Sequence, residues 1–385
     1  MLNGKKVVVT GAGGFIGSHL VEALVAAGAS VTAMVRYNSS SSIGNLAFLP
    51  PDMRRSVRIA SGNVEDSDFV FGVAKGQDVI FHLAALIAIP YSYEAPRSYV
   101  RANVEGTLNV LEAVRRFDIA RMVHTSTSEV YGTALYAPID EKHPLQGQSP
   151  YSATKIGADK LAESYFRSFE TPVVTVRPFN TFGPRQSARA FIPTIISQAL
   201  ARDEIHLGSL TPERDMTFVS DTVAGFLAAA TAPGVPGMTL NLGTGVTHSV
   251  GWFAKRILEL MKLDKPIVQD EDRLRPALSE VMKLVSDNAL AEDGQQALAL
   301  IESGLRVDLV LTDLSMPNMG GAELAARLRE RGTQLPVLFM SGNLEEPELR
   351  EQIERGHAQF LQKPVRMRDL AWATRELLDG KLGAP

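Results

Sequence analysis

Short apolar runs alternate along the chain with longer stretches in which apolar residues recur every three or four positions. The runs have the length and the β-branched content of buried parallel strands, and they cover residues 7–10, 30–35, 57–62, 78–84, 121–127 and 172–178. Amphipathic helical patterns lie between them, such as those over residues 18–28 and 103–117. This alternation predicts an α/β fold, a doubly wound parallel sheet with helices on both faces.

The pattern becomes less regular after residue 180. Residues 185–220 and 232–285 contain clusters of proline and glycine. Candidate elements in this part are helices near 191–202 and 249–262 and a strand at 239–244. We expect this part to form a smaller lobe that closes over the carboxyl edge of the sheet.

A second α/β rhythm begins near residue 289. Strand patterns in DLVLTD, LPVLFMSG and AQFLQKPV are separated by helical patterns. No glycine- or serine-rich linker precedes them. We therefore predict a separate C-terminal α/β unit over residues 289–385.

Composition excludes several classes of protein. The chain has 385 residues, 45% of them hydrophobic, so it is long enough to bury more than one core. Its formal net charge of −4 argues against a nucleic-acid partner. It has no cysteine, which excludes disulfides and thiolate metal sites, and we predict no metal centre. No apolar run approaches the roughly 20 residues that span a bilayer. We expect a soluble, cytoplasmic protein without a membrane partner.

Three glycines follow the first strand and open a helix: Gly11, Gly14 and Gly17. Glycine permits the tight turn and the close approach of a pyrophosphate, and the helix N-terminus favours phosphate. The pattern predicts a Rossmann-type NAD(P)-binding turn that also includes Phe15 and Ile16. The alternative is a purely structural glycine turn. The predicted organisation is an NAD(P)-binding Rossmann domain over residues 1–180, interleaved with a substrate-binding lobe over residues 181–288.

Arg36 lies at the end of the second strand. An acidic residue there would bind a ribose 2′-hydroxyl, whereas arginine can accommodate a 2′-phosphate. We therefore expect NADP or NAD, with NADP favoured. The alternative is that Arg36 is a solvated strand-end residue. The other predicted cofactor contacts, also near strand ends, are Asn38, Asn63, Val64, Leu83, Ala84 and Ala85.

The segment YSATK places Tyr151 and Lys155 four residues apart, on one helix face. A lysine ammonium beside a phenol lowers the tyrosine pKa from about 10, so the tyrosine can act as a base toward a sugar hydroxyl. Upstream, HTSTSEVYG places Thr127 and Glu129 at a strand end, where ligands bind in open α/β sheets. Both could instead only cap a loop.

Seven ordered motifs resemble the extended short-chain dehydrogenase/reductases, in particular the nucleotide-sugar epimerase/dehydratase group. They are TGAGGFIG, HLAA, NVEGT, STSEVYG, YSATK, RPFNTFGPR and RDMTFVSDT, and the resemblance covers about residues 5–288. The segments ALIAIPYSYEAP and RLRPALSEVMKLVSDN resemble UDP-N-acetylglucosamine 4,6-dehydratases. The resemblance also implies a homodimer, in which the helices with NVEGTLNVLEAV and YSATK form a bundle.

The resemblance implies a lyase mechanism on a nucleotide sugar. Tyr151, assisted by Lys155 and Thr127, takes the O4 proton while C4 gives a hydride to the nicotinamide. Glu129 removes the C5 proton, water leaves from C6, and the hydride returns there. Dehydratases of the dTDP-glucose type carry an aspartate where this chain has Ser128, whereas those of the GDP-mannose type share Thr-Ser-Glu. Simple 4-epimerases usually lack the glutamate, so we favour a dehydratase, with a 4-epimerase as the alternative. The family positions for the substrate diphosphate are Asn180, Arg214 and Arg275.

The C-terminal unit resembles a response-regulator receiver domain, a flavodoxin-like α/β unit. Asp313 matches the phosphoacceptor, Ser341 the hydroxyl switch residue and Lys363 the lysine that contacts the phosphoryl group. The expected first strand with adjacent acids is replaced by VMKLVSDNALA, which belongs to the enzyme pattern, so we interpret the unit as truncated and inactive in the phosphorelay. The alternative is a phosphorylation-responsive signalling protein with a nucleotide-binding sensor. The fusion could be natural or spliced.

Overall fold

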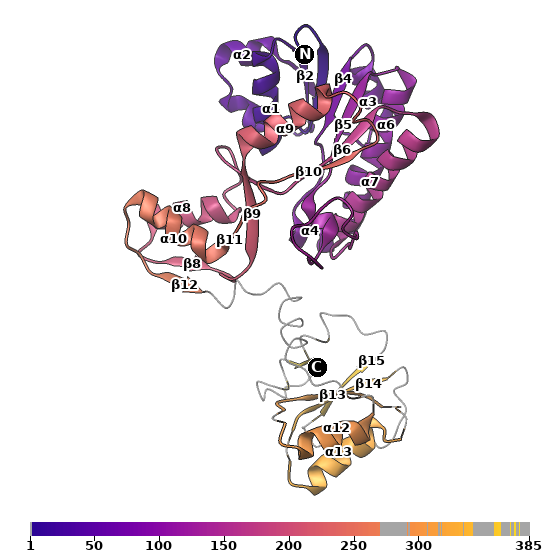
Figure 1. Ribbon diagram of the computed structural model, residues 1–385, viewed down its shortest axis with the longest axis vertical. Helices are drawn as coiled ribbons and strands as arrows, with labels where there is room; N and C mark the ends of the chain where they lie inside the picture. The colour runs from indigo at the N-terminus through magenta and orange to yellow at the C-terminus, as the bar shows by residue number, and fades with distance from the viewer. Residues whose placement is uncertain are drawn as a thin grey trace. The chain divides into compact units, whose positions relative to one another are not determined.

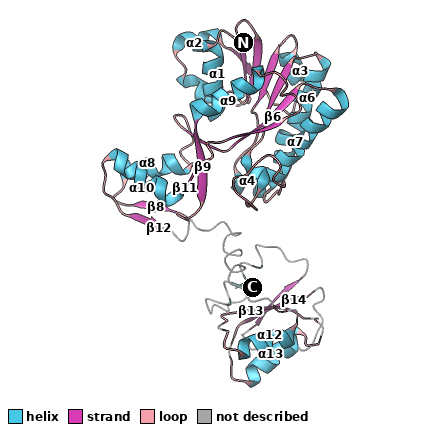
Figure 2. Cartoon of the chain, viewed as in Figure 1, coloured by secondary structure: helices cyan, strands magenta, loops and turns pink. Residues whose placement is uncertain are grey.

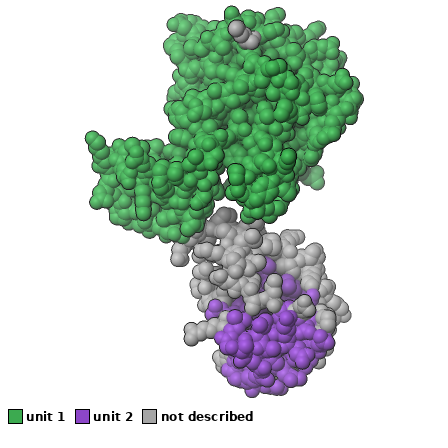
Figure 3. Space-filling model, in the orientation of Figure 1, with its two compact units in different colours: residues 1–269 green, residues 270–385 purple. Residues whose placement is uncertain are grey.

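The computed structural model divides into two compact units, residues 1–269 and 270–385 (Figure 3). The described residues are 2–269, 291–341 without 292, 306, 315, 317 and 334, then 358–362, 370, 373, 374 and 377. The segment of residues 273–288 that resembles the dehydratases lies outside them. The predicted division at residues 180 and 288 stays a prediction.

A seven-stranded sheet forms the centre of the first unit (Figure 1). Its strands are β1 (Lys6–Thr10), β2 (Ser30–Val35), β3 (Arg58–Ser61), β4 (Val79–His82), β5 (Arg121–Thr125), β6 (Val173–Pro178) and β10 (Thr239–Leu242). Their order is β10-β6-β5-β4-β1-β2-β3, and every neighbouring pair is parallel. The predicted doubly wound sheet is confirmed. Its order reverses between β1 and β4, where such sheets bind ligands.

Helices cover both faces of this sheet (Figure 2). Outside the small lobe they are α1 (Phe15–Ala26), η1 (Gly44–Phe48), α2 (Pro51–Ser56), α3 (Ser67–Ala74), α4 (Ile89–Glu94), α5 (Pro96–Tyr99), η2 (Val100–Glu105), α6 (Gly106–Arg116), η3 (Ser128–Tyr131), α7 (Pro150–Phe169) and α9 (Val219–Thr231). One core joins α1 and α9 to the sheet, and the other joins α3, α6 and α7. Strands covered on both sides must be apolar throughout, which explains the continuous valine runs.

A smaller lobe follows, as predicted, but the strand expected in it at residues 239–244 is β10 of the main sheet, because it pairs in parallel with β6. Its elements are β7 (Asn180–Phe182), α8 (Phe191–Ala201), β8 (Ile205–Leu207), β9 (Glu213–Phe218), β11 (Thr247–Ser249), α10 (Val250–Met261) and β12 (Ile267–Gln269). Strands β11, β9 and β7 form one sheet, and β12 pairs with β8. Ile195 of α8 and Leu258 of α10 pack into a separate small core.

The second unit has its own core and sheet. Its described elements are α12 (Gly294–Glu302), β13 (Val310–Asp313), α13 (Gly321–Glu330), β14 (Val337–Ser341) and β15 (Ala358–Gln362). The strands are parallel in the order β13-β14-β15. Leu298 and Leu324 pack against Phe339 in the core. The predicted C-terminal α/β unit is confirmed in the part that the structure describes.

None of the described helices combines the length and the apolar character that crossing a membrane requires.

Candidate active site

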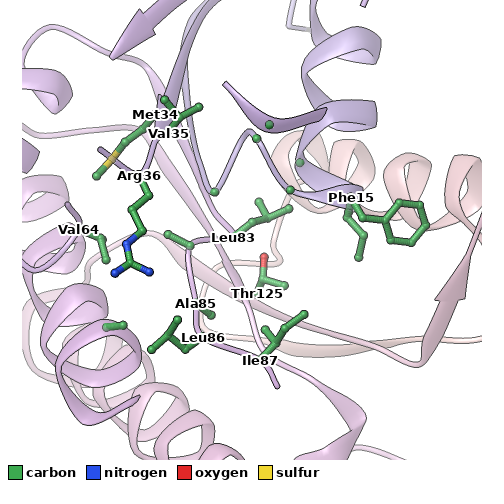
Figure 4. Close-up of a pocket in the computed structure, with 18 of the residues that line it drawn as sticks. Phe15, Met34, Val35, Arg36, Val64, Leu83, Ala85, Leu86, Ile87 and Thr125 are labelled. Carbon is green, nitrogen blue, oxygen red and sulfur yellow. The ribbon is translucent and has the colours of Figure 1, made fainter. Parts of the chain in front are cut away.

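A cavity of about 880 Å³ lies at the carboxyl edge of the main sheet (Figure 4). Its wall includes the glycine turn after β1, the ends of β2, β4 and β5, and the start of α7. Fifteen of the predicted site residues line it: Gly11, Gly14, Phe15, Ile16, Gly17, Arg36, Asn38, Asn63, Val64, Leu83, Ala84, Ala85, Thr127, Tyr151 and Lys155. The volume suits a ligand of cofactor size.

The glycine turn is held tightly between β1, α1 and β4. Gly11 has a φ of 68°, and a Cβ there would lie 2.8 Å from the backbone nitrogen of Ala84. A Cβ on Gly17 would lie 2.3 Å from the carbonyl oxygen of Gly11. The N-cap residue of α1 is Gly14, which offers no side-chain cap, and the first turn of this helix contains no acidic residue. Its free N–H groups therefore suit a phosphate.

The end of β2 carries Arg36 and a short loop. The Arg36 side chain is exposed and extends into the space between Val64 and Leu83 (Figure 4). Asn38 holds the loop: its Nδ2 donates to the carbonyl oxygens of Arg36 (3.1 Å) and Ser42 (3.0 Å). Its Oδ1 accepts from the backbone N–H of Ser42 at 2.9 Å. The Asn38 side chain thus shapes the wall by fixing the loop.

Tyr151 and Lys155 lie near the start of α7, and both are buried. The Lys155 Nζ donates to the Thr125 carbonyl oxygen at 2.6 Å. Burial lowers the pKa of Lys155 to about 8, and the charge of Asp159 opposes this shift. Burial also raises the pKa of Tyr151 to about 12, although a hydrogen bond with Thr127 lowers it. The expected lowering of the Tyr151 pKa is therefore wrong for the protein alone, because desolvation outweighs the favourable contacts.

Glu129 and Ser128 follow Thr127 in the short helix η3. The Thr127 Oγ1 accepts from the backbone N–H of Glu129 at 3.2 Å and so caps this turn. Glu129 is exposed, and its negative charge contributes to the raised pKa of Tyr151. Neither Ser128 nor Glu129 belongs to the wall of the cavity as the structure describes it. Thr127 thus caps this turn, which is the alternative considered for it, and it also lies beside Tyr151.

The predicted diphosphate-binding residues are not gathered in the cavity wall. Asn180 is half-buried at the start of β7, between the wall residues Phe179 and Thr181. Arg214 is exposed on β9, and its guanidinium donates to the carbonyl oxygen of Glu213 at 2.8 Å. Arg275 lies outside the described residues.

Thr125 is a site residue that the sequence reasoning missed. Its Oγ1 is buried and has no hydrogen-bond partner among the described residues, and the residue lines the cavity (Figure 4). An orphaned hydroxyl in the cavity that the start of α1 also lines fits a dinucleotide, which has polar groups along its length. The signal was available, because Thr125 precedes Thr127 by two positions and alternate strand residues share a face.

In the second unit, Asp313 ends β13 and Ser341 ends β14. These strands are parallel neighbours, so both residues lie at the same edge of the small sheet. Lys363 lies outside the described residues. Among the residues described in either unit, no group of three or more histidine and carboxylate side chains could hold a metal ion.

Two family models match the chain. The model described as GDP-mannose 4,6 dehydratase matches residues 8–297, and the model described as response regulator receiver domain matches residues 266–375. The receiver match begins before residue 289 and contains the acidic run DED at residues 270–272. It thus includes the part of a receiver that the sequence interpretation takes as missing, so the truncation lacks support from this match.

A related protein and a related solved structure resemble the first unit. The dTDP-D-glucose 4,6-dehydratase of Mus musculus is 32% identical over 265 residues, which are 67% of this chain and 73% of that protein. The structure of UDP-N-acetylglucosamine 4-epimerase from Methanobrevibacter ruminantium is 29% identical with a TM-score of 0.64, over 71% of this chain and 87% of that one.

A third relative carries the cofactor. A double mutant of DesIV, a dTDP-glucose 4,6-dehydratase from Streptomyces venezuelae, has NAD bound. It is 28% identical with a TM-score of 0.62, over 69% of this chain and 85% of that one. The predicted preference for NADP has no support from this structure. The match over residues 8–297, together with the glycine turn and the tyrosine–lysine pair, leads to one conclusion: the chain belongs to the GDP-mannose 4,6 dehydratase family, the extended short-chain dehydrogenase/reductases that act as nucleotide-sugar 4,6-dehydratases or epimerases.

Proposed function

We propose that the chain is an NAD(P)-dependent 4,6-dehydratase of a UDP-sugar, with UDP-N-acetylglucosamine as the substrate. The observation that carries this proposal is the second acid–base group beside Tyr151. Glu129 lies two residues after Thr127, just beyond the end of β5. Its negative charge contributes to the raised pKa of the Tyr151 phenol. A dehydratase needs a base for the C5 proton in addition to the base at O4, whereas inversion at C4 needs only the latter.

Tyr151 is the proposed base for the O4 hydroxyl proton. Its own burial disfavours the phenolate, so the positive charge of Lys155, one helical turn away, and the hydrogen bond with Thr127 must favour it. Lys155 is held in place by the Thr125 carbonyl oxygen. Bound NAD supplies the hydride chemistry, because its nicotinamide takes a hydride and returns it within one catalytic cycle.

Glu129 is the proposed base for the C5 proton. A 4-keto group acidifies that proton, and a carboxylate at the strand end can remove it and pass it to the C6 hydroxyl, which then leaves as water. Glu129 is exposed, so it can exchange the proton with solvent. Ser128, next to it, is the proposed hydrogen-bonding group for the C6 hydroxyl.

The dinucleotide is proposed to bind along the glycine turn. NAD is supported by the related DesIV structure, while the Arg36 guanidinium in the wall suits a 2′-phosphate. Titration calorimetry with NAD and with NADP, repeated on Arg36→Ala, distinguishes the two cofactors. If Arg36 binds a 2′-phosphate, the substitution weakens NADP and leaves NAD unchanged.

The remaining family assignments stay proposals. Asn180, Arg214 and Arg275 are proposed to bind the substrate diphosphate, since cationic and amide groups suit it. A homodimer is proposed to form through α6 and α7, which lie side by side on one face of the sheet (Figure 1).

A 4-epimerase is the second candidate, and it is supported by the likeness to the Methanobrevibacter epimerase. The two functions are separated by incubating the full chain with UDP-N-acetylglucosamine and NAD and analysing the product. The dehydratase predicts a 4-keto-6-deoxy sugar, and an epimerase would give only the C4 epimer. Glu129→Gln is the matched variant: it should still form reduced nicotinamide from the substrate but release no 4-keto-6-deoxy product.

A further inference from the structure

A buried group of charged and polar side chains lies behind Lys155, away from the residues that contact substrate in the proposed mechanism. Its centre is Asp159, one helical turn after Lys155 on α7 and 5% exposed. The other members come from neighbouring strands: His124 and Ser126 from β5 and its end, and Arg177 from β6. Each of these three side chains is at least nine-tenths buried.

Asp159 is fully hydrogen-bonded. Its Oδ1 lies 3.2 Å from the His124 Nε2, and its Oδ2 accepts from the Ser126 hydroxyl at 2.8 Å. The same Oδ2 accepts from the Arg177 guanidinium at 3.1 and 2.9 Å. Arg177 in turn donates to the Tyr131 hydroxyl at 2.9 Å. A carboxylate held by this many donors stays ionised and in one position, and the pKa of Asp159 is lowered although burial alone would raise it.

The two histidines near this group are neutral. Since a carboxylate only accepts, the His124 Nε2 carries the proton that it shares with Asp159, and its Nδ1 has no partner among the described residues. The Thr10 hydroxyl accepts from two backbone N–H groups, so it must donate to the His82 Nδ1 at 2.8 Å. The His82 Nε2 then donates to Thr107 at 3.0 Å.

The charges of this buried group of side chains can therefore be counted. Arg177 and Lys155 are cations, Asp159 is an anion, and the histidines contribute no charge. Without Asp159, two cations would remain in a region from which water is excluded. Arginine does not lose its proton in proteins, so the lysine would have to lose its own.

We propose that Asp159 is a positioning residue that keeps Lys155 in the ammonium form, so that Lys155 can favour the Tyr151 phenolate. The inference rests on the proposed function, in which Lys155 assists Tyr151. Asp159 acts through Lys155 and is not part of the cavity wall as the structure describes it. Several titratable and charged groups of the described chain face Lys155 or its partners. They are Tyr151 and Asp159 on α7, Tyr99 on α5, His82 on β4, His124 on β5, Arg177 on β6, and Glu129 and Tyr131 on η3.

Competitive acetylation of the full chain tests this proposal without any substrate. The reactivity of Lys155 toward acetic anhydride, measured by peptide mass spectrometry across a pH series, gives the pH at which the ammonium loses its proton. In Asp159→Asn this midpoint should fall by about one pH unit or more. The matched control is Glu163→Gln, which removes a carboxylate one turn further along α7, where its partners Lys160 and Arg167 are exposed. The control should leave the midpoint unchanged.

A second test measures the alkaline limit of activity, the pH above which the enzymatic rate falls. Activity requires protonated Lys155 and falls as pH rises through its pKa, so Asp159→Asn should move this limit to lower pH, and Asp159→Glu should restore it. A purely structural role would lower activity equally at all pH values.

An unchanged Lys155 midpoint in folded Asp159→Asn would overturn the proposal. If that variant does not fold, the Lys155 midpoint of the wild-type chain tests the proposal instead. A wild-type midpoint below about pH 6, as for buried lysines without a neighbouring anion, would overturn the proposal. A chain that shows no dehydratase activity but the expected acetylation midpoints would contradict the proposed function alone.

Discussion

Gly17 shows at the scale of one residue how close the backbone approach in the cofactor turn is. Its Cα faces the Gly11 carbonyl, and a Cβ would be only 2.3 Å from that oxygen. Backbone on both sides cannot move without shifting β1 or α1. The turn, and with it the row of free N–H groups on α1, therefore depends on glycine at this position.

We predict that Gly17→Ala weakens the binding of NAD at least tenfold and lowers the melting temperature. Titration calorimetry and thermal unfolding of the full chain measure the two effects. The matched control is Gly72→Ala, in the middle of α3, where a Cβ would meet nothing within 4 Å. Because alanine is the better helix former, the control should raise the free energy of unfolding by up to about 1 kcal/mol. Wild-type affinity for NAD in Gly17→Ala would contradict this account of the turn.

His82 makes the stability of the protein depend on pH. Burial, together with the positive charge of Lys155, holds the pKa of His82 well below its usual value of 6.5. The folded protein keeps His82 neutral, whereas the unfolded chain binds a proton as pH falls below 6.5. Stability is therefore lost toward acid, by up to about 1.4 kcal/mol per pH unit for this residue.

The variant His82→Asn should reduce the loss of unfolding free energy as the pH falls. Denaturant unfolding at intervals from pH 8 to about pH 5 gives the slope, and the difference at pH 8 isolates the packing cost of the substitution. The His124 contribution remains, since the pKa of His124 is lowered as well, chiefly by burial. A slope identical to that of the wild-type chain would mean that His82 is not the titrating group.

Some site residues could be predicted from sequence and others could not, for a physical reason. Tyr151 and Lys155 were visible because both lie on one helix face, four residues apart. The partners of Asp159 were not, because His124 is 35 residues away and Arg177 is 18 away. They meet only through the parallel pairing of β5 with β6. Similarly, the spacing of Tyr151 and Lys155 can be read from the sequence, whereas the burial that raises the pKa of Tyr151 cannot.

At the scale of elements, α7 is the helix on which the proposed chemistry depends. Ser149 caps it reciprocally with Ser152: the Ser149 hydroxyl accepts from the Ser152 N–H at 3.1 Å, and the Ser149 N–H donates to the Ser152 hydroxyl at 2.9 Å. Pro150 follows in the first turn, where its missing N–H costs nothing. This cap fixes the turn that contains Tyr151.

We predict that Ser149→Ala lowers the free energy of unfolding by about 1 kcal/mol and also lowers kcat, because the first turn of α7 loosens. The matched control is Ser249→Ala. The Ser249 side chain also caps its helix, α10, and accepts from the Trp252 N–H at 3.1 Å, but α10 has no proposed catalytic residue. The control should lose similar stability and keep its kcat. Equal losses of kcat in both variants would contradict the assigned role of α7.

Strands β1 to β6 of the main sheet were predictable because each has four or more residues and lies between helical patterns. In contrast, β10 has only two apolar residues, Leu240 and Leu242, and only its pairing with β6 places it in the main sheet rather than in the small lobe. The strands β7, β8, β11 and β12 have three residues each, which is too short for a period of two to be recognised. The boundary of the second unit was harder still. Residues 266–297 fit both family models, so one stretch of sequence satisfies two patterns, and periodicity cannot choose between them.

At the scale of the whole molecule, the chain has two units with separate hydrophobic cores. Leu324 is 1% exposed in the core of the second unit, and the buried residues of that core all lie between residues 298 and 358. The cores of the first unit contain none of them. Destabilising one core should therefore act on its own unit.

We predict that Leu324→Ala destabilises the second unit by about 2–5 kcal/mol, because it leaves a cavity in a packed core. Hydrogen exchange read by mass spectrometry should show faster exchange in β13 and β14 and unchanged exchange in β1 and β4. The control Leu305→Ala removes an exposed leucine of the same unit, 40% accessible to solvent, and should change little. Equal acceleration in β1 and β4 would show that the units unfold as one.

The central claim is that the first unit moves a hydride from C4 to C6 of a nucleotide sugar and removes water between the two. The most direct measurement uses UDP-N-acetylglucosamine with deuterium at C4, incubated with the full chain and NAD, followed by NMR of the product. We predict a 4-keto-6-deoxy sugar with the deuterium at C6 and no external reductant consumed. A product that keeps its deuterium at C4 with inverted configuration would contradict the claim and identify the protein as an epimerase.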